Sequence, residues 1–423
     1  MGENLKKSAA HTGSKIFVTT FFLTALLTGI VWGSIQYETP ANRRAQEVLP
    51  SRLISGPHFR VQDRVVADGY MFRFTVNSDY GTFLVGGKYG LRKLIREIQA
   101  IAALRQVNQG QALLNGARGK ARETLEFGLK LANAPLDTVV SIPQGVAKLF
   151  SNISGGLQDS HDPRRDTVAE KVLNVSGAKR KLAYDLGVDV YSSNRVLQNE
   201  LDNVARAQAL GALAVSAAIP YGGGAAVSLS GMSRTAREVN GLLRDEPPGA
   251  LRTRNQGKLQ AMGVDPGLAA RFLNHYAFTP RHQTIIVACL EKLSGAQGRN
   301  KFINFALSAS DEETANFFQN MAEMLETYNR TVSPIREINV PGVLVARAAN
   351  GTALVPFPLD YGVWSPRAER VVKKTLAART GRAKPASIEL WVSGAMSPLA
   401  SNRLEAQGIR VVENVDRRIG LSD

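Results

Sequence analysis

The chain has 423 residues, more than one ordinary domain holds, and this length suits two or three domains. Hydrophobic residues make up 44% and charged residues 21%, which excludes a disordered or fibrous protein, and a single cysteine, Cys289, excludes an internal disulfide. The formal net charge of +16 favours an anionic partner: nucleic acid, anionic lipid headgroups or an acidic envelope polymer.

The first 36 residues have the pattern of a membrane-targeting segment. Lys6, Lys7 and Lys15 precede residues 16–35, a run without charge that is mainly apolar. As a helix this run would be about 30 Å long, the thickness of a bilayer's hydrocarbon core, and the basic residues before it favour an N-in orientation. The sequence predicts a transmembrane signal anchor, with a cleaved signal peptide and a buried core helix as alternatives.

Both the anchor and the signal peptide place the rest of the chain outside the cytoplasm. We therefore expect a protein of the bacterial inner membrane that faces the periplasm, or a periplasmic or secreted protein if the segment is cleaved. This location disfavours nucleic acid as the natural anion, despite the basic composition.

The next segments predict a linker and then a small α+β unit. Residues 37–60 contain three prolines among polar neighbours and are typical of a linker. Residues 61–109 read as a β-hairpin plus a helix, because apolar residues first alternate and then recur at helical spacing. The helix can cover one face of the hairpin.

Residues 110–335 predict a helical domain interrupted by glycine and proline. Thr279 followed by Pro280 marks a helix start, and Ser310 with Glu313 predicts a capping box at another. An Ala/Gly-rich stretch, residues 207–233, contains Pro220 and three successive glycines, which should break a straight helix. We expect two short helices packed as a buried hairpin, with a hairpin that dips into the membrane as the alternative.

Residues 336–423 predict a small α/β module. Asn350 and Gly351 sit between two apolar runs and favour a hairpin turn. The order hairpin, helix, strand, helix, strand then implies parallel strands joined by crossover helices. The expected fold class is α+β and mostly helical, with an N-terminal hairpin plus helix, a central helical body and this C-terminal module.

Weak catalytic candidates lie in two stretches of the helical domain. His275, Arg281 and His282 share one stretch, while Asp185 and Asp189 could form a pair of carboxylates for acid–base chemistry. Residues of these types in such positions also serve as helix caps and turn formers, which is the simpler interpretation.

No metal site or cofactor site is expected. His282 and Cys289 lie seven residues apart, about 10 Å along a helix, which is too far for one ion. The glycine-rich stretch has no lysine after it and follows no strand, so it does not fit a phosphate-binding loop. The Cys289 thiol lies on the apolar face of a helix, where we expect it to be buried and inert.

Basic residues form two candidate anion-binding surfaces, one on the C-terminal module and one in the helical domain. They are Arg367, Arg370, Lys373, Lys374 and Arg379 in the first, and Lys179, Arg180 and Lys181 in the second. Few aromatic residues accompany them, which weakens a nucleic-acid interpretation.

Three strings, "LGVDVYSSNRVLQNELDNVA", "FLNHYAFTPRHQT" and "ELWVSGAMSPLASNRLEAQGIRVVE", resemble a group of exported bacterial proteins without an assigned activity. The resemblance implies a location in the cell envelope and a shared architecture from about residue 60 onward. It assigns no catalytic residue.

The targeting segment, the positive charge and the absence of a catalytic motif favour a non-catalytic envelope protein that binds anionic lipid or polymer, and protein partners. Two alternatives remain open. One is a hydrolase-type enzyme with a site between the helical body and the C-terminal module. The other is a membrane-active protein that uses the hairpin at residues 207–233.

Overall fold

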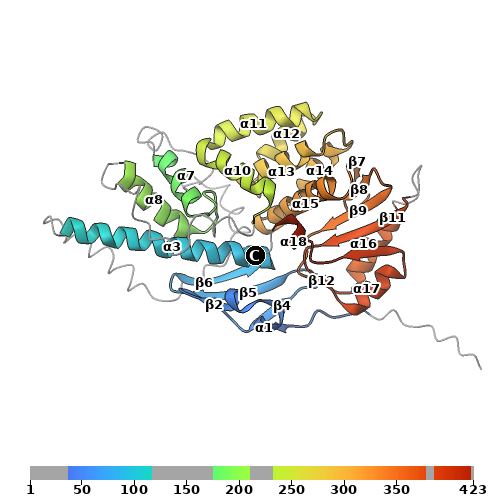
Figure 1. Cartoon of the computed structure of the whole chain (residues 1–423), viewed down its shortest axis with the longest axis horizontal. Helices are drawn as coiled ribbons and strands as arrows, with labels where there is room; N and C mark the ends of the chain where they lie inside the picture. Colours follow the sequence, from blue (N-terminus) through green and yellow to red (C-terminus); the bar gives the residue numbers. More distant parts are fainter. Residues whose placement is uncertain (1–36, 117–174, 210–231, 378–384, 421–423) are drawn as a thin grey trace, which may run out of the picture. The chain divides into compact units, whose positions relative to one another are not determined.

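A computed structural model describes residues 37–116, 175–209, 232–377 and 385–420 of the chain (Figure 1). These residues all belong to one compact unit, Tyr37–Asp423. The predicted fold class is confirmed: the fold is α+β and mostly helical, with an N-terminal antiparallel sheet, a helical middle and a C-terminal sheet. The apolar run at residues 16–35 lies outside the described residues.

The N-terminal part of the fold contains a sheet of six strands and two short helices. They are β1 (Arg43–Arg44), α1 (Ala45–Val48), α2 (Ser51–Ile54), β2 (Ser55–Gly56), β3 (Phe59–Val61), β4 (Arg64–Ala67), β5 (Phe72–Ser78) and β6 (Gly81–Gly86). Strand β5 pairs antiparallel with β3, β4 and β6. The β5–β6 pair is the predicted hairpin.

Alternation along β5 produces the first hydrophobic core. Phe72, Phe74 and Val76 are buried on one face of the sheet. Helix α3 (Gly87–Gly116) covers that face with Leu91 and Ile98, which are fully buried. Each of these large side chains contributes roughly 1.5–3 kcal/mol by leaving water, so the apolar pattern fixes which side of the helix faces the sheet.

The segment at residues 37–60 is not the linker that its prolines predict. Ala45, Leu49, Leu53 and Phe59 are buried in the core under the sheet. Pro50 precedes α2 as its N-cap residue, and Pro57 lies between β2 and β3. Single apolar residues at the right spacing are enough to pack this segment into the fold, and composition alone did not reveal them.

The helical middle contains eight helices among the described residues. They are α7 (Val175–Asp185), α8 (Arg195–Ala209), α10 (Arg234–Asp245), α11 (Pro248–Ala261), α12 (Pro266–Leu273), α13 (Pro280–Lys292), α14 (Arg299–Ala306) and α15 (Glu312–Thr331). Most of the hairpin predicted at residues 207–233 falls outside the described part. Within the described ranges, none of the helices combines the length and the apolar character that crossing a bilayer requires.

Two predicted helix starts can be compared with the structure. The Thr279 side chain accepts from the His282 backbone N–H, and Pro280 is the first residue of α13, as predicted. At α15 the predicted pair, Ser310 with Glu313, is wrong by one residue. The capping box is formed by Asp311 and Thr314, because the Asp311 carboxylate reaches the Thr314 N–H at 2.7 Å.

The C-terminal module confirms the predicted order of elements and adds short strands. It contains β7 (Ile335–Asn339), β8 (Val345–Ala348), β9 (Thr352–Phe357), β10 (Tyr361–Gly362), α16 (Pro366–Ala377), β11 (Ser387–Val392), β12 (Ala395–Met396), α17 (Pro398–Glu405), β13 (Ile409–Val412) and α18 (Asp416–Ile419). The main sheet has the order β13-β11-β9-β8-β7. The strands β9, β11 and β13 are parallel, and β8 and β9 form the hairpin around Gly351, whose φ is +83°.

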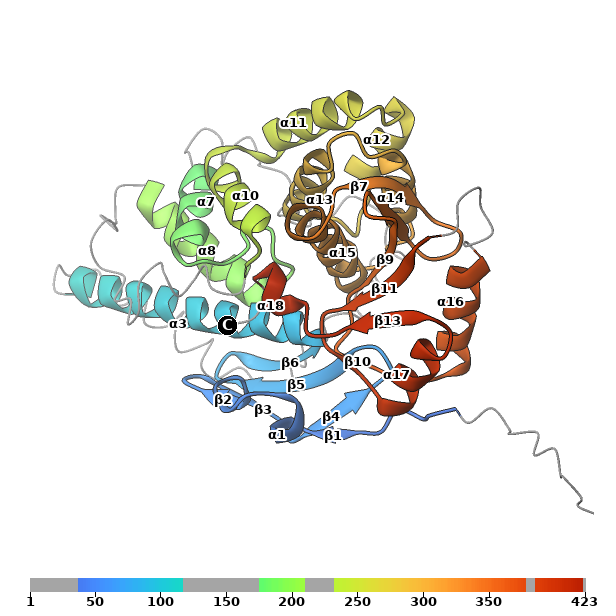
Figure 2. The same ribbon diagram turned by 45° about the vertical axis from the view of Figure 1, so that its right-hand side comes forward.

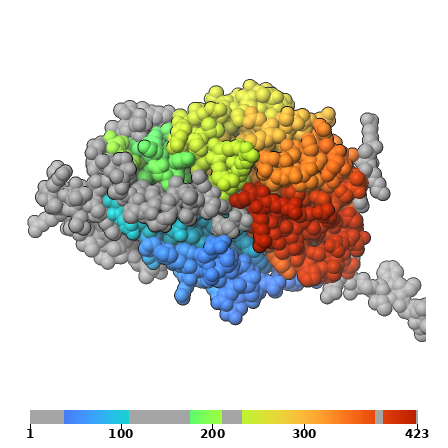
Figure 3. Space-filling view, viewed as in Figure 1, coloured from blue at the N-terminus to red at the C-terminus, as the bar shows by residue number. Residues whose placement is uncertain are grey.

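Both faces of this sheet are covered (Figure 2). Leu354 and Trp391 belong to the core of the helical middle, where the Trp391 ring meets Tyr328 edge-on at 4.9 Å. Val355 and Ile388 point the other way and pack under α16 and α17. Helix α16 therefore has one apolar side on the sheet and one side in solvent, and the module contributes to the molecular surface in Figure 3.

Asp360 joins the C-terminal module to the N-terminal sheet. Its carboxylate accepts from the backbone N–H of Phe72 at 3.0 Å and from that of Lys88 at 3.1 Å. The Lys88 N–H belongs to the first turn of α3, so the acceptor also caps this helix. One buried carboxylate thus ties three parts of the fold together.

Candidate functional site

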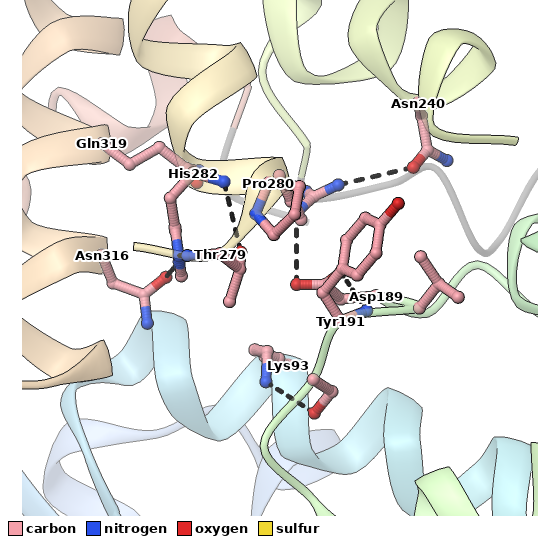
Figure 4. Close-up of polar contacts among 12 residues, drawn as sticks. Lys93, Asp189, Tyr191, Asn240, Thr279, Pro280, His282, Asn316 and Gln319 are labelled. Carbon is pink, nitrogen blue, oxygen red and sulfur yellow. Dashed lines mark hydrogen bonds and ion pairs between the residues drawn. The ribbon is translucent and has the colours of Figure 1, made fainter. Parts of the chain in front are cut away.

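A group of buried and half-buried polar side chains lies where α3, the loop at residues 186–194, the start of α13 and α15 converge (Figure 4). We call it the buried polar cluster. Its members are Tyr89, Lys93, Glu97, Asp189, Ser192, Asn194, Thr279, Arg281, His282, Glu312, Asn316, Gln319 and Glu323, with Asn240 of α10 at its edge. It contains three of the predicted catalytic candidates: Asp189, Arg281 and His282.

Lys93 is held between two carboxylates. Its Nζ lies 2.8 Å from Glu97 Oε1 and 3.0 Å from Glu312 Oε1, and it donates to Ser192 Oγ at 3.1 Å. Burial by itself would lower the pKa of Lys93, but the charges of Glu312 and Glu97 outweigh burial and raise it above its ordinary value. The lysine is a fixed cation, so it cannot serve as a base for Ser192.

The two carboxylates that contact Lys93, those of Glu97 and Glu312, are both held by neighbouring groups. Ser192 Oγ donates to Glu97 Oε1 at 2.6 Å, and Asn194 Nδ2 donates to the other oxygen at 3.1 Å. Burial raises the pKa of Glu312, but Lys93 outweighs this effect and the pKa falls to about 2. Glu312 is therefore a stable anion at neutral pH, since the Lys93 cation lies within contact distance.

Arg281 and Asp189 form a second, looser pair. The Arg281 Nε lies 3.9 Å from Asp189 Oδ2, and its Nη1 donates to Asn240 Oδ1 at 3.4 Å. Burial lowers the pKa of Arg281, but Tyr89 and Asp189 raise it by more, so the guanidinium keeps its charge. The Asp189 Oδ1 accepts from the Tyr191 N–H at 2.9 Å, which fixes the loop as a turn.

His282 holds the start of α13 together. Its Nδ1 accepts from the Thr279 backbone N–H at 3.2 Å, so the ring proton lies on Nε2, which donates to Asn316 Oδ1 at 3.0 Å. Burial lowers the pKa of His282, so the ring is neutral at pH 7. With both nitrogens in fixed hydrogen bonds, His282 acts as a capping residue, which is the simpler of the two interpretations given above.

Glu323 is the carboxyl group of the cluster whose pKa is raised toward neutrality. Burial raises its pKa to about 7, although Ser233 Oγ donates to Oε1 at 2.6 Å. The other carboxylate oxygen, Oε2, meets no hydrogen-bond partner in the part of the chain that the structure describes. Such a group releases its proton near neutral pH, which makes it a source of pH-dependent stability.

The remaining catalytic candidates lie elsewhere. His275 accepts the Ala277 N–H at 3.3 Å and stacks on Tyr276, and its Nε2 lies 3.1 Å from the Leu307 carbonyl. Asp185 ends α7 beside Lys181 and Arg244, and burial raises its pKa. Neither is part of the cluster, so the five candidates do not form one site between the helical body and the C-terminal module.

Sequence reasoning missed Lys93, Glu97, Ser192, Glu312 and Glu323. One signal was readable: Glu97 falls on the apolar stripe of α3, three residues after Leu94 and four before Ile101. A charge on an apolar stripe indicates a buried partner, but the pattern does not reveal which residue it is.

The two predicted anion-binding surfaces differ in the structure. Lys179 is buried, with its Nζ 2.5 Å from Asp202 Oδ1, so its charge is already neutralised and it is not a surface anion-binding residue. Arg180 is half-buried and Lys181 exposed. On α16, by contrast, Arg367, Arg370, Lys373 and Lys374 are all exposed. Arg379 lies outside the described residues.

Cys289 is buried, and burial raises the pKa of its thiol, as expected for an inert cysteine. Among the described ranges, no group of three or more His, Cys, Asp or Glu residues is placed to hold a metal ion.

No protein-family model matches the chain, and neither a curated protein sequence nor a solved structure is significantly similar to it.

Proposed function

We propose that this chain is a non-catalytic protein of the cell envelope that binds an anionic partner, lipid or polymer, through the exposed cations of α16. The proposal joins the predicted membrane segment at residues 16–35 to one structural feature. That feature is a basic helix side that the fold leaves in solvent.

The arrangement of α16 supports this proposal most directly. Arg367, Arg370 and Lys374 follow one another at spacings of three and four residues, which places them on one side of the helix. Val372 and Thr375 are buried on the opposite side.

Few carboxylates are close enough to neutralise these cations. Glu369 is the one carboxylate of α16, and it pairs with Lys373 at 3.1 Å. Among the described residues, Arg370 and Lys374 have no ion-pair partner. The α16 side therefore presents an excess of positive charge that attracts anions beyond contact distance.

The buried polar cluster is consistent with a role in folding. Its lysine and arginine keep their protons, Glu312 keeps its negative charge, and both nitrogens of His282 are bound. Acid–base catalysis needs a group that exchanges its proton with a reacting partner. The four groups named here are held by neighbouring residues instead, and Glu323, whose pKa is about 7, is buried.

Flotation of residues 37–423 with lipid vesicles tests the proposal. At about 0.15 M salt we expect binding to vesicles with anionic lipid and none to neutral vesicles. The double variant Arg370→Gln/Lys374→Gln should lower partitioning about 30-fold, because each cation near an anionic surface contributes roughly 1 kcal/mol. The matched control, Arg195→Gln/Arg271→Gln, removes the same charge from exposed positions on α8 and α12 and should bind normally. Equal losses in both variants would reduce the effect to net charge and exclude a specific α16 surface.

A further inference from the structure

The first described residues lie against the C-terminal module, although more than 320 residues separate them along the chain. Tyr37 OH donates to Glu369 Oε2 at 2.7 Å, across a separation of 332 residues. The Glu38 backbone N–H donates to the Trp364 carbonyl at 2.7 Å. The chain that leaves the N-terminal segment is thus attached to α16 and to the residues just before it.

The Glu38 carboxylate strengthens this attachment. Its Oε2 accepts from the Trp364 N–H at 2.7 Å and from Ser397 Oγ at 2.5 Å. Ser397 is the N-cap residue of α17, and Ser365, next to Trp364, caps α16. A carboxylate at the starts of two helices is stabilised by their positive ends. We call the contacts of Tyr37 and Glu38 with these residues the exit clamp.

The exit clamp lies among the cations of α16. Glu369, which Tyr37 contacts, has Lys373 and Arg403 as charged neighbours. The positive charge of Arg370 also interacts electrostatically with the Tyr37 hydroxyl. Only Gln36 separates Tyr37 from residue 35, where the apolar run ends. The exit clamp therefore begins two residues after the apolar run in the sequence.

We infer that the partner of α16 is the anionic headgroup layer of the membrane in which residues 16–35 are anchored, and that the exit clamp orients the folded body with α16 toward that layer. The inference rests on the proposed function and selects lipid over a soluble polymer. A flexible exit would let the body turn in any direction, whereas an exit fixed at two successive residues presents one face to the headgroups.

The full-length protein, reconstituted in vesicles, tests this orientation. One label is attached at Lys373→Cys on α16 and another, in a separate protein, at Arg195→Cys on α8. Figures 1 and 2 show these helices on opposite sides of the view, and both variants lose one exposed cation. The native Cys289 is buried, and its raised thiol pKa protects it from labelling.

The measurement is quenching of each label by a paramagnetic chelate attached to lipid headgroups. We expect quenching at position 373 to exceed that at position 195 at least threefold, in vesicles that contain anionic lipid. Glu38→Ala, which removes the clamp's carboxylate, should reduce the ratio toward one, while Glu38→Gln should reduce it less because its side-chain oxygen still accepts. Circular dichroism melting of each variant checks that the body remains folded.

Two results overturn the inference: equal quenching at both positions in the folded wild-type sequence, or loss of the difference when a soluble anionic polymer competes at equal charge concentration. The proposed function fails separately. If residues 37–423 bind anionic vesicles through α16 while the two labels are quenched equally, the proposed binding surface is supported and the proposed orientation is wrong. If the quenching of the two labels differs but vesicle binding does not depend on Arg370 and Lys374, the orientation is supported and the proposed anionic partner of α16 is wrong.

Discussion

The buried polar cluster and the α16 surface use the same residue types with opposite results. Lys93 is surrounded by Glu97, Glu312 and Ser192, so its charge is satisfied inside the protein. Lys374 and Arg370 extend into solvent, and the described chain supplies them no carboxylate. Buried charge must be matched within the fold, whereas exposed charge can remain in excess and attract a partner.

This difference explains why the predicted candidates separate as they do. Asp189, Arg281 and His282 are close in space, but each holds another part of the chain in place. The sequence predicted both Lys179 and Lys373 as anion-binding residues, yet Lys179 is buried against Asp202 and Lys373 is exposed. Environment, and not residue type, decides which charges are available for binding.

Removing a carboxylate from the cluster should have the largest effect. Glu97→Ala leaves Lys93 with one carboxylate partner, Glu312, and removes an acceptor from Ser192 and Asn194. Breaking a buried ion pair costs roughly 3–5 kcal/mol, and we expect a loss of that size in urea unfolding of residues 37–423. Glu405→Ala, an exposed carboxylate on α17, is the matched control and should leave the midpoint unchanged. A loss below about 1 kcal/mol for Glu97→Ala would contradict the role given to the cluster.

Glu323 should make stability depend on pH. Its pKa is about 7 in the folded protein against an ordinary value of 4.5, so the folded state holds this proton more tightly than the unfolded state. The contribution is fully present below pH 4.5 and is lost as the pH rises to 7, by roughly 3 kcal/mol. Glu323→Gln should remove this dependence, measured as urea unfolding at pH 5 and pH 8. An identical pH slope in the variant would show that another group is responsible.

The capping box at α13 should have an intermediate effect. Thr279→Ala removes the oxygen that accepts the His282 backbone N–H and should lower the free energy of unfolding by about 1–2 kcal/mol. Thr279→Ser keeps that oxygen and should recover most of the loss in the same urea experiment. If serine is as destabilising as alanine, packing of the methyl group accounts for the effect and the hydrogen bond does not.

The smallest effect is expected on α16. Lys373→Ala removes an exposed cation whose side chain is 69% accessible, and its pair with Glu369 lies at the surface. Exposed pairs contribute little, so thermal unfolding and the urea midpoint should not change measurably. A clear destabilisation would mean that this helix side contributes to the fold, and the contrast with the cluster would weaken.

Local elements were predictable because their signals are local. Alternation of Phe72, Phe74 and Val76 indicated a strand, and Thr279 with Pro280 indicated a helix start. The site was less predictable. Glu97 meets Ser192 across 95 residues and Tyr37 meets Glu369 across 332, and no pattern within one segment encodes such pairs. The prediction of a linker at residues 37–60 was wrong for a related reason. The few apolar residues of this segment become core residues only because they pack against the sheet.

By itself the sequence determined the excess of positive charge, the apolar run at residues 16–35, the class of fold and the order of elements in the C-terminal module. Those properties follow from composition and from short periodic patterns, which each segment carries on its own. Only the tertiary structure decided which charges neutralise one another and which remain exposed. Burial and pairing depend on contacts between elements that are distant along the chain, and packing of the whole core sets those contacts.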